Sequence, residues 1–220
     1  MQGLIGKKQG MTQIFDQSGK RVPVTVIEAG PCVVVQTKSV AHDGYEAVQI
    51  GFGVKKEQRT TKALAGHFRK AGVGPCRNMR EFKADAGEEL KPGDTVGVAI
   101  FEGATHVDVT GIAKGRGFQG VVRRHRMAGG PATHGHRSHR RIGAIGQRAK
   151  PGNISKGHRM PGHMGNVQVT QQNLRVVEVR KDDNLLLVEG AVPGPTGGLV
   201  VVKKALKKPT RQTAASGEKR

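Results

Sequence analysis

The sequence predicts a mainly β protein: a closed β-barrel with one short helical segment and a long extension rich in Gly, Arg and His. Two observations predict the barrel. Short Val-rich runs with alternating apolar residues occupy both ends of the chain, and Gly, Pro, Asp and Asn separate these runs. A third observation predicts the extension, since residues 111–165 hold 13 Gly and 3 Pro but few bulky aliphatic side chains. Such a segment buries too little apolar surface to form a core.

The strand over 21–30 has the clearest alternation. In "RVPVTVIEAG" we expect Val22, Val24 and Val26 to point inward and Thr25 to point outward. The other strands are expected at 31–39, 46–52, 78–84, 94–101, 105–112, 174–180, 185–192 and 198–206, with turns at "HDGY" (42–45) and "KDDN" (181–184).

One helix is expected, over residues 60–72. Leu64 and Phe68 lie four residues apart and share a helix face, and Gly72 can end the helix. The chain then divides into a barrel body (1–110 and 166–202), a basic arm inserted into it (111–165) and a basic C-terminal tail (203–220). We expect the arm to leave one strand and return to the next, and to become ordered on its partner.

The formal charge of +20 is concentrated in two segments. Residues 109–177 contain 13 Lys and Arg and no Asp or Glu, and residues 203–220 carry a net charge of +6. The rest is nearly neutral: residues 1–108 have a net charge of +3 and residues 178–202 have −2. A solvated surface normally mixes both signs, so this distribution indicates a protein that binds a polyanion.

The composition of the arm suits folded RNA. Arg grips phosphate through two donors and stacks on bases, a nearby phosphate favours protonated His, and Gly lets the backbone approach phosphates. Gly115, Gly117 and Gly120 are the candidates for close backbone approach. The candidate RNA-binding side chains are Lys114, Arg116, Arg123, Arg124, Arg126, His134, His136, Arg137, His139, Arg140, Arg141, Gln147, Arg148, Lys150, Lys156, His158, Arg159 and His163.

The three glycines also have the G-x-G-x-x-G spacing of nucleotide-binding loops. The dinucleotide interpretation needs a long helix afterwards and an acid about 20 residues on, but "GGP" follows at 129–131 and the next acid is Glu178. The kinase interpretation lacks its V-A-I-K, H-R-D and D-F-G partners. The segment also has a faint similarity to an RRM aromatic motif at Phe118, but Arg116 stands where a stacking aromatic belongs, so base stacking is expected to be minor.

His134, His136 and His139 imitate a zinc-binding pattern. No acid lies near enough to orient them, and the adjacent arginines would repel a divalent cation, so we predict neither metal nor cofactor. Cys32 and Cys76 are far apart and are expected to be free thiols in a reducing cytoplasm. No stretch approaches the length of a membrane span, and the N-terminus lacks the pattern of a signal peptide.

Five stretches of the chain resemble one family, the large-subunit ribosomal protein L-three family in its bacterial form. The N-terminal and central signatures of that family are matched at 3–15 and 108–124, and the similarity continues in order. The stretches are "GLIGKKQGMTQIF" (3–15), "DVTGIAKGRGFQGVVRR" (108–124), "ATHGHRSHRRIGAIGQ" (132–147), "KPGNISKGHRMPGHMGN" (150–166) and "NLLLVEGAVPGPTG" (184–197).

This resemblance implies a translation-factor-like barrel and a structural role in the large subunit, without catalysis. It implies that the body binds near the 3′ end of the 23S RNA and nucleates assembly, while the arm reaches toward the peptidyl-transferase region. The implied neighbours are the fourteenth and nineteenth large-subunit proteins, in a bacterial cytoplasm. Gln147 matches a glutamine that is methylated in some bacteria by a glutamine methyltransferase; a plain RNA contact is the alternative.

Three other interpretations remain to be compared with this one. In the first, the chain is an enzyme that uses the glycine loop or the histidines. In the second it is a free nucleic-acid chaperone with a disordered arm, and in the third its arm is only a flexible basic linker. Against the linker stand the stretches 142–147 ("IGAIGQ") and 153–160 ("NISKGHRM"), which look buried.

Overall fold

A computed structural model describes residues 1–85 and 90–208. The chain divides into two compact units. One consists of the residues before 113 and those after 167, and we call it the body; the other is Ala113–Val167, which we call the arm unit. Most of the tail predicted at 203–220 lies outside the described residues.

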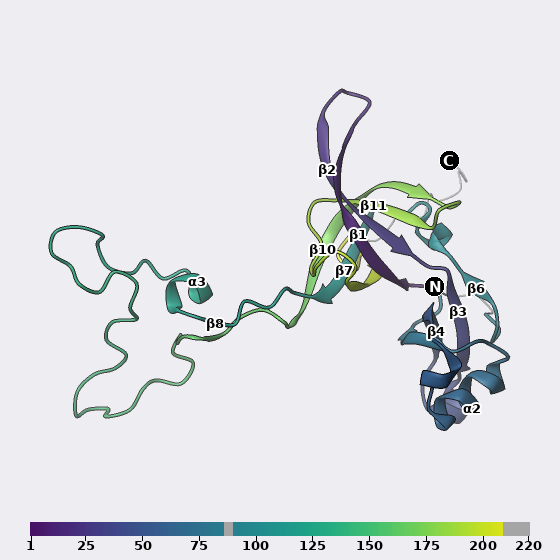
Figure 1. Cartoon of the computed structure of the whole chain (residues 1–220), viewed down its shortest axis with the longest axis horizontal. Coiled ribbons are helices and arrows are strands. Elements are labelled where there is room, and N and C mark those ends of the chain that lie inside the picture. Colours follow the sequence, from purple (N-terminus) through teal and green to yellow (C-terminus); the bar gives the residue numbers. More distant parts are fainter. Residues whose placement is uncertain (86–89, 209–220) are drawn as a thin grey trace, which may run out of the picture. The chain divides into compact units, whose positions relative to one another are not determined.

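The body contains a closed antiparallel barrel in the order β1-β12-β7-β10-β11-β2 (Figure 1). This confirms the prediction of a mainly β protein with a barrel. Its strands are β1 (Gly3–Phe15), β2 (Arg21–Ala29), β7 (His106–Ile112), β10 (Gln168–Arg180), β11 (Leu185–Glu189) and β12 (Leu199–Lys204).

Strand β1 was not among the predicted strands. Its Gly and Lys content hides the alternation, but its glycines are needed where the neighbouring chain segments come close. A Cβ on Gly3 would lie 2.5 Å from the Val202 carbonyl oxygen, and one on Gly6 would lie 2.6 Å from that of Glu28. These residues flank the pairing of β1 with both β12 and β2, which closes the barrel.

A second antiparallel sheet has the order β5-β4-β3-β6, so the strands of the first half do not all join the barrel as expected. The prediction for 94–101 was only partly right: Thr95–Val96 is strand, whereas Val98–Phe101 is a 3-10 helix (η2) that buries Val98 and Phe101 on one side. The strands are β3 (Cys32–Lys38), β4 (Ala47–Val54), β5 (Cys76–Phe82) and β6 (Thr95–Val96).

The predicted helix is confirmed as α2 (Lys62–Ala71), with Phe68 buried and Gly72 in the left-handed conformation at its end. The expectation of only one helical segment was wrong, because short segments too brief to show a helical period also form single turns. These are α1 (Val40–Asp43), η1 (Glu57–Arg59) and, in the arm unit, α3 (Val121–His125). None of the described helices is long and apolar enough to cross a membrane.

The prediction for β2 was partly right: the face of Val22 and Val24 is buried as expected, but the opposite face, which carries Thr25, is buried as well. Val22 and Val24 are buried, but in a small separate cluster with Leu187, and Val26 packs only partly buried against it. The other face carries Ile27 into the main core, and Thr25 shares that face and is fully buried. The Thr25 hydroxyl donates to the Gly190 carbonyl oxygen at 2.6 Å, which satisfies a polar group in the interior.

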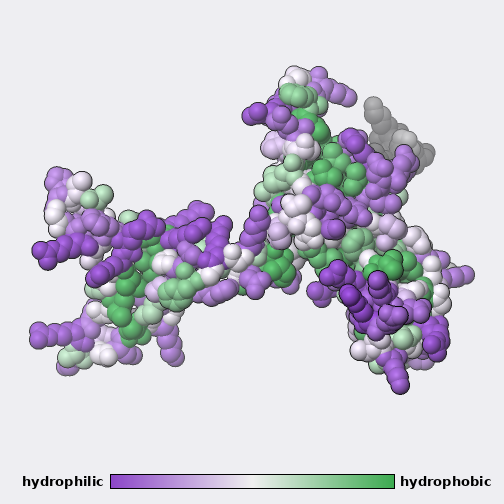
Figure 2. Space-filling model, viewed as in Figure 1, coloured by the Kyte–Doolittle hydropathy of each residue, from purple (hydrophilic) through white to green (hydrophobic). Residues whose placement is uncertain are grey.

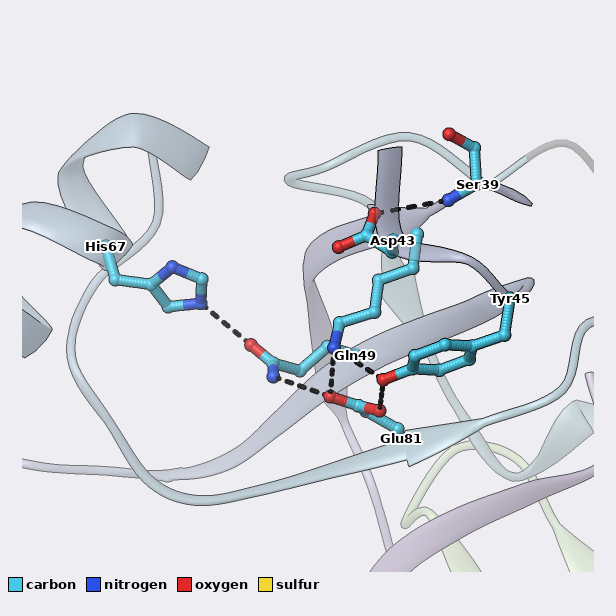
Figure 3. Close-up of polar contacts among 7 residues, drawn as sticks. Ser39, Asp43, Tyr45, Gln49, His67 and Glu81 are labelled. Atoms are coloured by element: carbon cyan, nitrogen blue, oxygen red, sulfur yellow. Dashed lines mark hydrogen bonds and ion pairs between the residues drawn. The ribbon is translucent and has the colours of Figure 1, made fainter. Parts of the chain in front are cut away.

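A polar network fixes α2 to the second sheet (Figure 3). His67 of α2 donates to Gln49 at 2.7 Å, and Gln49 donates to Glu81 at 3.3 Å. Glu81 also contacts Lys38 at 2.9 Å and accepts a hydrogen bond from Tyr45 at 2.8 Å. The Lys38 ammonium, followed by the Tyr45 hydroxyl, holds the pKa of the Glu81 carboxyl below its ordinary value.

Both cysteines are free thiols, as predicted. Cys32 of β3 lies in the main hydrophobic core, where burial raises the pKa of its thiol to about 12, and partial burial also raises the pKa of Cys76. Neither thiol is therefore poised as a nucleophile.

We expect the body to fold without the arm unit. Ile112 of β7 lies directly opposite Gln168 of β10, so an Asn-Gly turn can replace residues 113–167 without changing the register of these strands. The shortened protein should melt cooperatively within about 5 °C of the full chain, because the core lies in the body. Val109→Asp in the shortened protein is the control that should abolish the transition. A shortened protein with no cooperative melt would contradict this expectation.

Candidate nucleic-acid interface

The arm unit carries a dense and uncompensated positive charge. It contains 12 Lys and Arg and no Asp or Glu, and all 18 candidate RNA-binding side chains belong to exposed residues. Within the described part of the chain, no ion pair joins one of them to a carboxylate. Figure 2 shows hydrophilic side chains projecting from much of this unit. The field of these cations is therefore available to an external anion.

The unit begins with a two-stranded ladder made by its own two ends. The Ala113 amide donates to Val167 at 2.9 Å and the Arg116 amide donates to Met164 at 2.9 Å. The ladder continues into β8 (Phe118–Gln119) and β9 (Gly162–His163), where Phe118 lies opposite His163. These backbone hydrogen bonds give the base of the arm an order that its composition did not predict.

Helix α3 is tied to the returning chain through one carbonyl group. The Arg124 guanidinium donates to the Met160 carbonyl oxygen at 2.7 Å, and Nε2 of His125 donates to the same oxygen at 3.0 Å. Val121 at the start of the helix is buried, with 2% of its surface exposed. Arg124, predicted as an RNA contact, thus also has a structural role, and the role of His125 was not anticipated.

Hydrogen bonds at residues 130–139 close the loop after α3. The Gly130 amide donates to the His139 carbonyl oxygen at 3.0 Å, and Nδ1 of His139 donates to Pro131 at 2.8 Å. The rings of His136 and His139 have centroids 6.3 Å apart. The described residues contain no group of three His, Cys, Asp or Glu side chains placed to hold a metal ion. His139 is thus engaged by the backbone of its own loop.

The stretches that looked buried are not. Ile145 and Ile154 keep 39% and 42% of their surface exposed, because the arm offers too few bulky neighbours to cover them. Gln147 and the cations from Arg148 to Arg159 are likewise exposed. The structure brings Lys114, Arg116 and His163 to the ladder, whereas residues 134–159 lie on loops beyond it.

The local structure also disfavours the nucleotide-loop interpretation of the glycines. Helix α3 after Gly120 has five residues, too short for a dinucleotide fold. Gly117 has φ +65°, and a Cβ there or on Gly120 would meet open space. The backbone at these glycines is consequently accessible from outside.

Comparison with known proteins places the chain among ribosomal proteins. The family model described as ribosomal protein L3 matches residues 72–218. The chain is similar to the large ribosomal subunit protein uL3 of Alkaliphilus metalliredigens, with 52% identity over 94% of this chain and 99% of that protein. It has 53% identity to the uL3 protein of Corynebacterium jeikeium over 94% and 95%, and 52% to that of Deinococcus radiodurans over 100% of both chains.

A test of the ladder uses two glycines with the same φ angle. Gly165 and Gly143 both have φ +78°, but a Cβ on Gly165 would lie 2.1 Å from the Lys114 carbonyl oxygen, whereas one on Gly143 would meet nothing within 4 Å. Gly165→Ala should therefore open the ladder and speed amide hydrogen exchange at Arg116 and Met164 about tenfold or more. Gly143→Ala is the matched control and should leave those amides unchanged. Equal exchange in the two variants would show that the ladder does not depend on this close approach.

Proposed function

This chain belongs to the ribosomal protein L3 family, and from that membership we propose that it binds the large-subunit ribosomal RNA directly through the arm unit. Its relatives are structural proteins of the large ribosomal subunit, and the chain is a structural constituent of that kind rather than an enzyme. One observation carries the proposal: 12 Lys and Arg within 55 residues, with no acid, all on exposed residues.

The geometry of the arm unit supports RNA over other polyanions. An ordered base presents Lys114 and Arg116, while the loops beyond it carry most of the remaining cations. The described residues include no helix in this unit longer than five residues, so a recognition helix for the DNA major groove is not available there. Folded RNA is recognised largely by shape, which exposed arginines and accessible glycine backbone can follow.

The finer assignments follow from the family. We propose that the body is a translation-factor-like barrel that binds near the 3′ end of the 23S RNA, nucleates subunit assembly and lies beside the fourteenth and nineteenth large-subunit proteins. The protein then acts in the bacterial cytoplasm, and the arm extends toward the peptidyl-transferase region. Gln147 is exposed, which suits modification by a glutamine methyltransferase, and direct contact with RNA is the alternative role.

RNA binding should weaken steeply with salt, because each phosphate that the protein neutralises releases condensed counterions. If about six of the 12 arm cations reach phosphates, the slope of log affinity against log salt should be about −4 to −5. Filter binding of the full chain to purified 23S RNA measures this slope. The shortened protein that lacks residues 113–167 is the control and should have a much shallower slope. A slope near zero for the full chain would refute binding through the arm.

Co-sedimentation separates a ribosomal constituent from a free nucleic-acid chaperone. The protein should remain with large subunits through a high-salt wash, since the folded RNA of an assembled subunit contacts many residues of the protein at once. A chaperone held only by charge would be released.

The loop residues 134–147 should affect function more than incorporation. Arg140→Ala removes one charged contact, worth about 1.5 to 3 kcal/mol locally, so the remaining contacts should still hold the protein in the subunit. A small displacement of the RNA around the catalytic centre lowers the rate of the reaction there. We therefore expect peptidyl transfer to slow about 2- to 10-fold, or the affinity of drugs for that centre to change. Arg59→Ala, an exposed arginine of the body, is the control. Full occupancy with normal rate and normal drug affinity would make the loop a passive filler.

A further inference from the structure

Phe118 is the one phenylalanine of the arm unit, and 75% of its surface is accessible. It lies on β8 directly opposite His163 of β9, and residues directly opposite in an antiparallel pair project from the same face. Both aromatic side chains therefore project from the same face of the ladder. A large ring held at this exposure by a strand, rather than by a loose loop, has a defined direction.

The other face of the same ladder is covered. Gln119 and Gly162 form the next pair, so their side-chain positions point to the opposite face. A Cβ on Gly162 would lie 2.6 Å from Nη1 of Arg124, which shows that the guanidinium from α3 occupies that face. The Arg124 side chain thus lies behind the ladder, and Phe118 and His163 are exposed on the other face.

Cations flank the exposed face. Lys114 and Arg116 precede Phe118 in the chain, in the part of the ladder that leads into β8. Arg116 has the thioether sulfur of Met164 at 4.0 Å as a weak acceptor, and no acid exists in the arm unit to neutralise it. A phosphate bound to Lys114 or Arg116 would place its attached base close to the Phe118 ring.

We propose that Phe118, with His163 beside it, is a stacking platform for one unpaired RNA base. Aromatic rings bind splayed bases by stacking, and flanking cations hold the adjacent phosphates. This inference rests on the proposed RNA binding of the arm. It adds a base contact at Phe118, where the sequence motif predicted that base stacking is minor. A protein partner is disfavoured because an acid-free surface with 12 Lys and Arg would need a strongly acidic surface opposite the ring.

The test compares two probes on the full-length protein: an RNA octamer of adenosines and an abasic octamer with the same backbone. Phe118→Leu should weaken binding of the adenosine octamer about 5- to 100-fold and change the abasic octamer less than twofold. Phe118→Tyr should bind as the unchanged protein does. Phe15→Leu, which alters a body ring with 70% of its surface exposed, is the matched control and should have no effect.

The outcomes distinguish the platform from the broader proposal. Unchanged affinity of Phe118→Leu for the adenosine octamer, or an equal loss on both octamers, overturns the platform while leaving RNA binding by the arm intact. If the unchanged protein binds neither octamer and also does not bind 23S RNA, the proposed function itself is overturned. A photoreactive benzoylphenylalanine at position 118 adds a measurement in assembled subunits. A cross-link to ribosomal RNA supports the platform, and a cross-link to a ribosomal protein refutes it.

Discussion

The antiparallel pairing of β7 with β10 is the constraint on which the rest of the structure depends. Both strands belong to the wall of the closed barrel, where β7 also pairs with β12 and β10 also pairs with β11. Their residues Val107, Val109 and Leu174 bury their side chains in the main core. The same pairing sets Ile112 opposite Gln168, so both ends of the arm unit start from adjacent positions. The barrel closes without contributions from the 55 residues between them. The arm is thereby released from any requirement to build a core.

The two units differ in whether acids neutralise their cations. In the body, cations lie beside acids, as in Arg175 with Glu189 and Lys181 with Glu102. Such exposed ion pairs add little stability, but the acids cancel the field of the cations. The arm unit has no acid to pair with. An isolated chain must therefore bear the mutual repulsion of these cations, and a polyanion relieves it on binding. The segregation of charge ties the sequence directly to the proposed RNA partner.

Hydrogen bonds replace apolar burial as the source of local order in the arm unit. The carbonyl of Met160 accepts from both Arg124 and His125, the His139 carbonyl accepts from Gly130, and the ladder joins the two ends of the unit. Order at the base, with exposed loops beyond it, directs Phe118 and its neighbouring cations outward. We infer that ordering by the partner concerns those loops, since the ladder needs no partner to satisfy its backbone groups.

The sequence by itself determined what depends on composition and local pattern: the β class, most strands, helix α2, the basic arm and its exposed cations. The family resemblance added the ribosomal role. Only the tertiary structure decided that both faces of β2 are buried, that β3 to β6 form their own sheet, and that β1 is a strand. It also decided that Arg124 lies behind the ladder and Phe118 faces solvent. The physical reason is the same in each case, because the burial of a strand face depends on segments distant in sequence, which local alternation does not reveal.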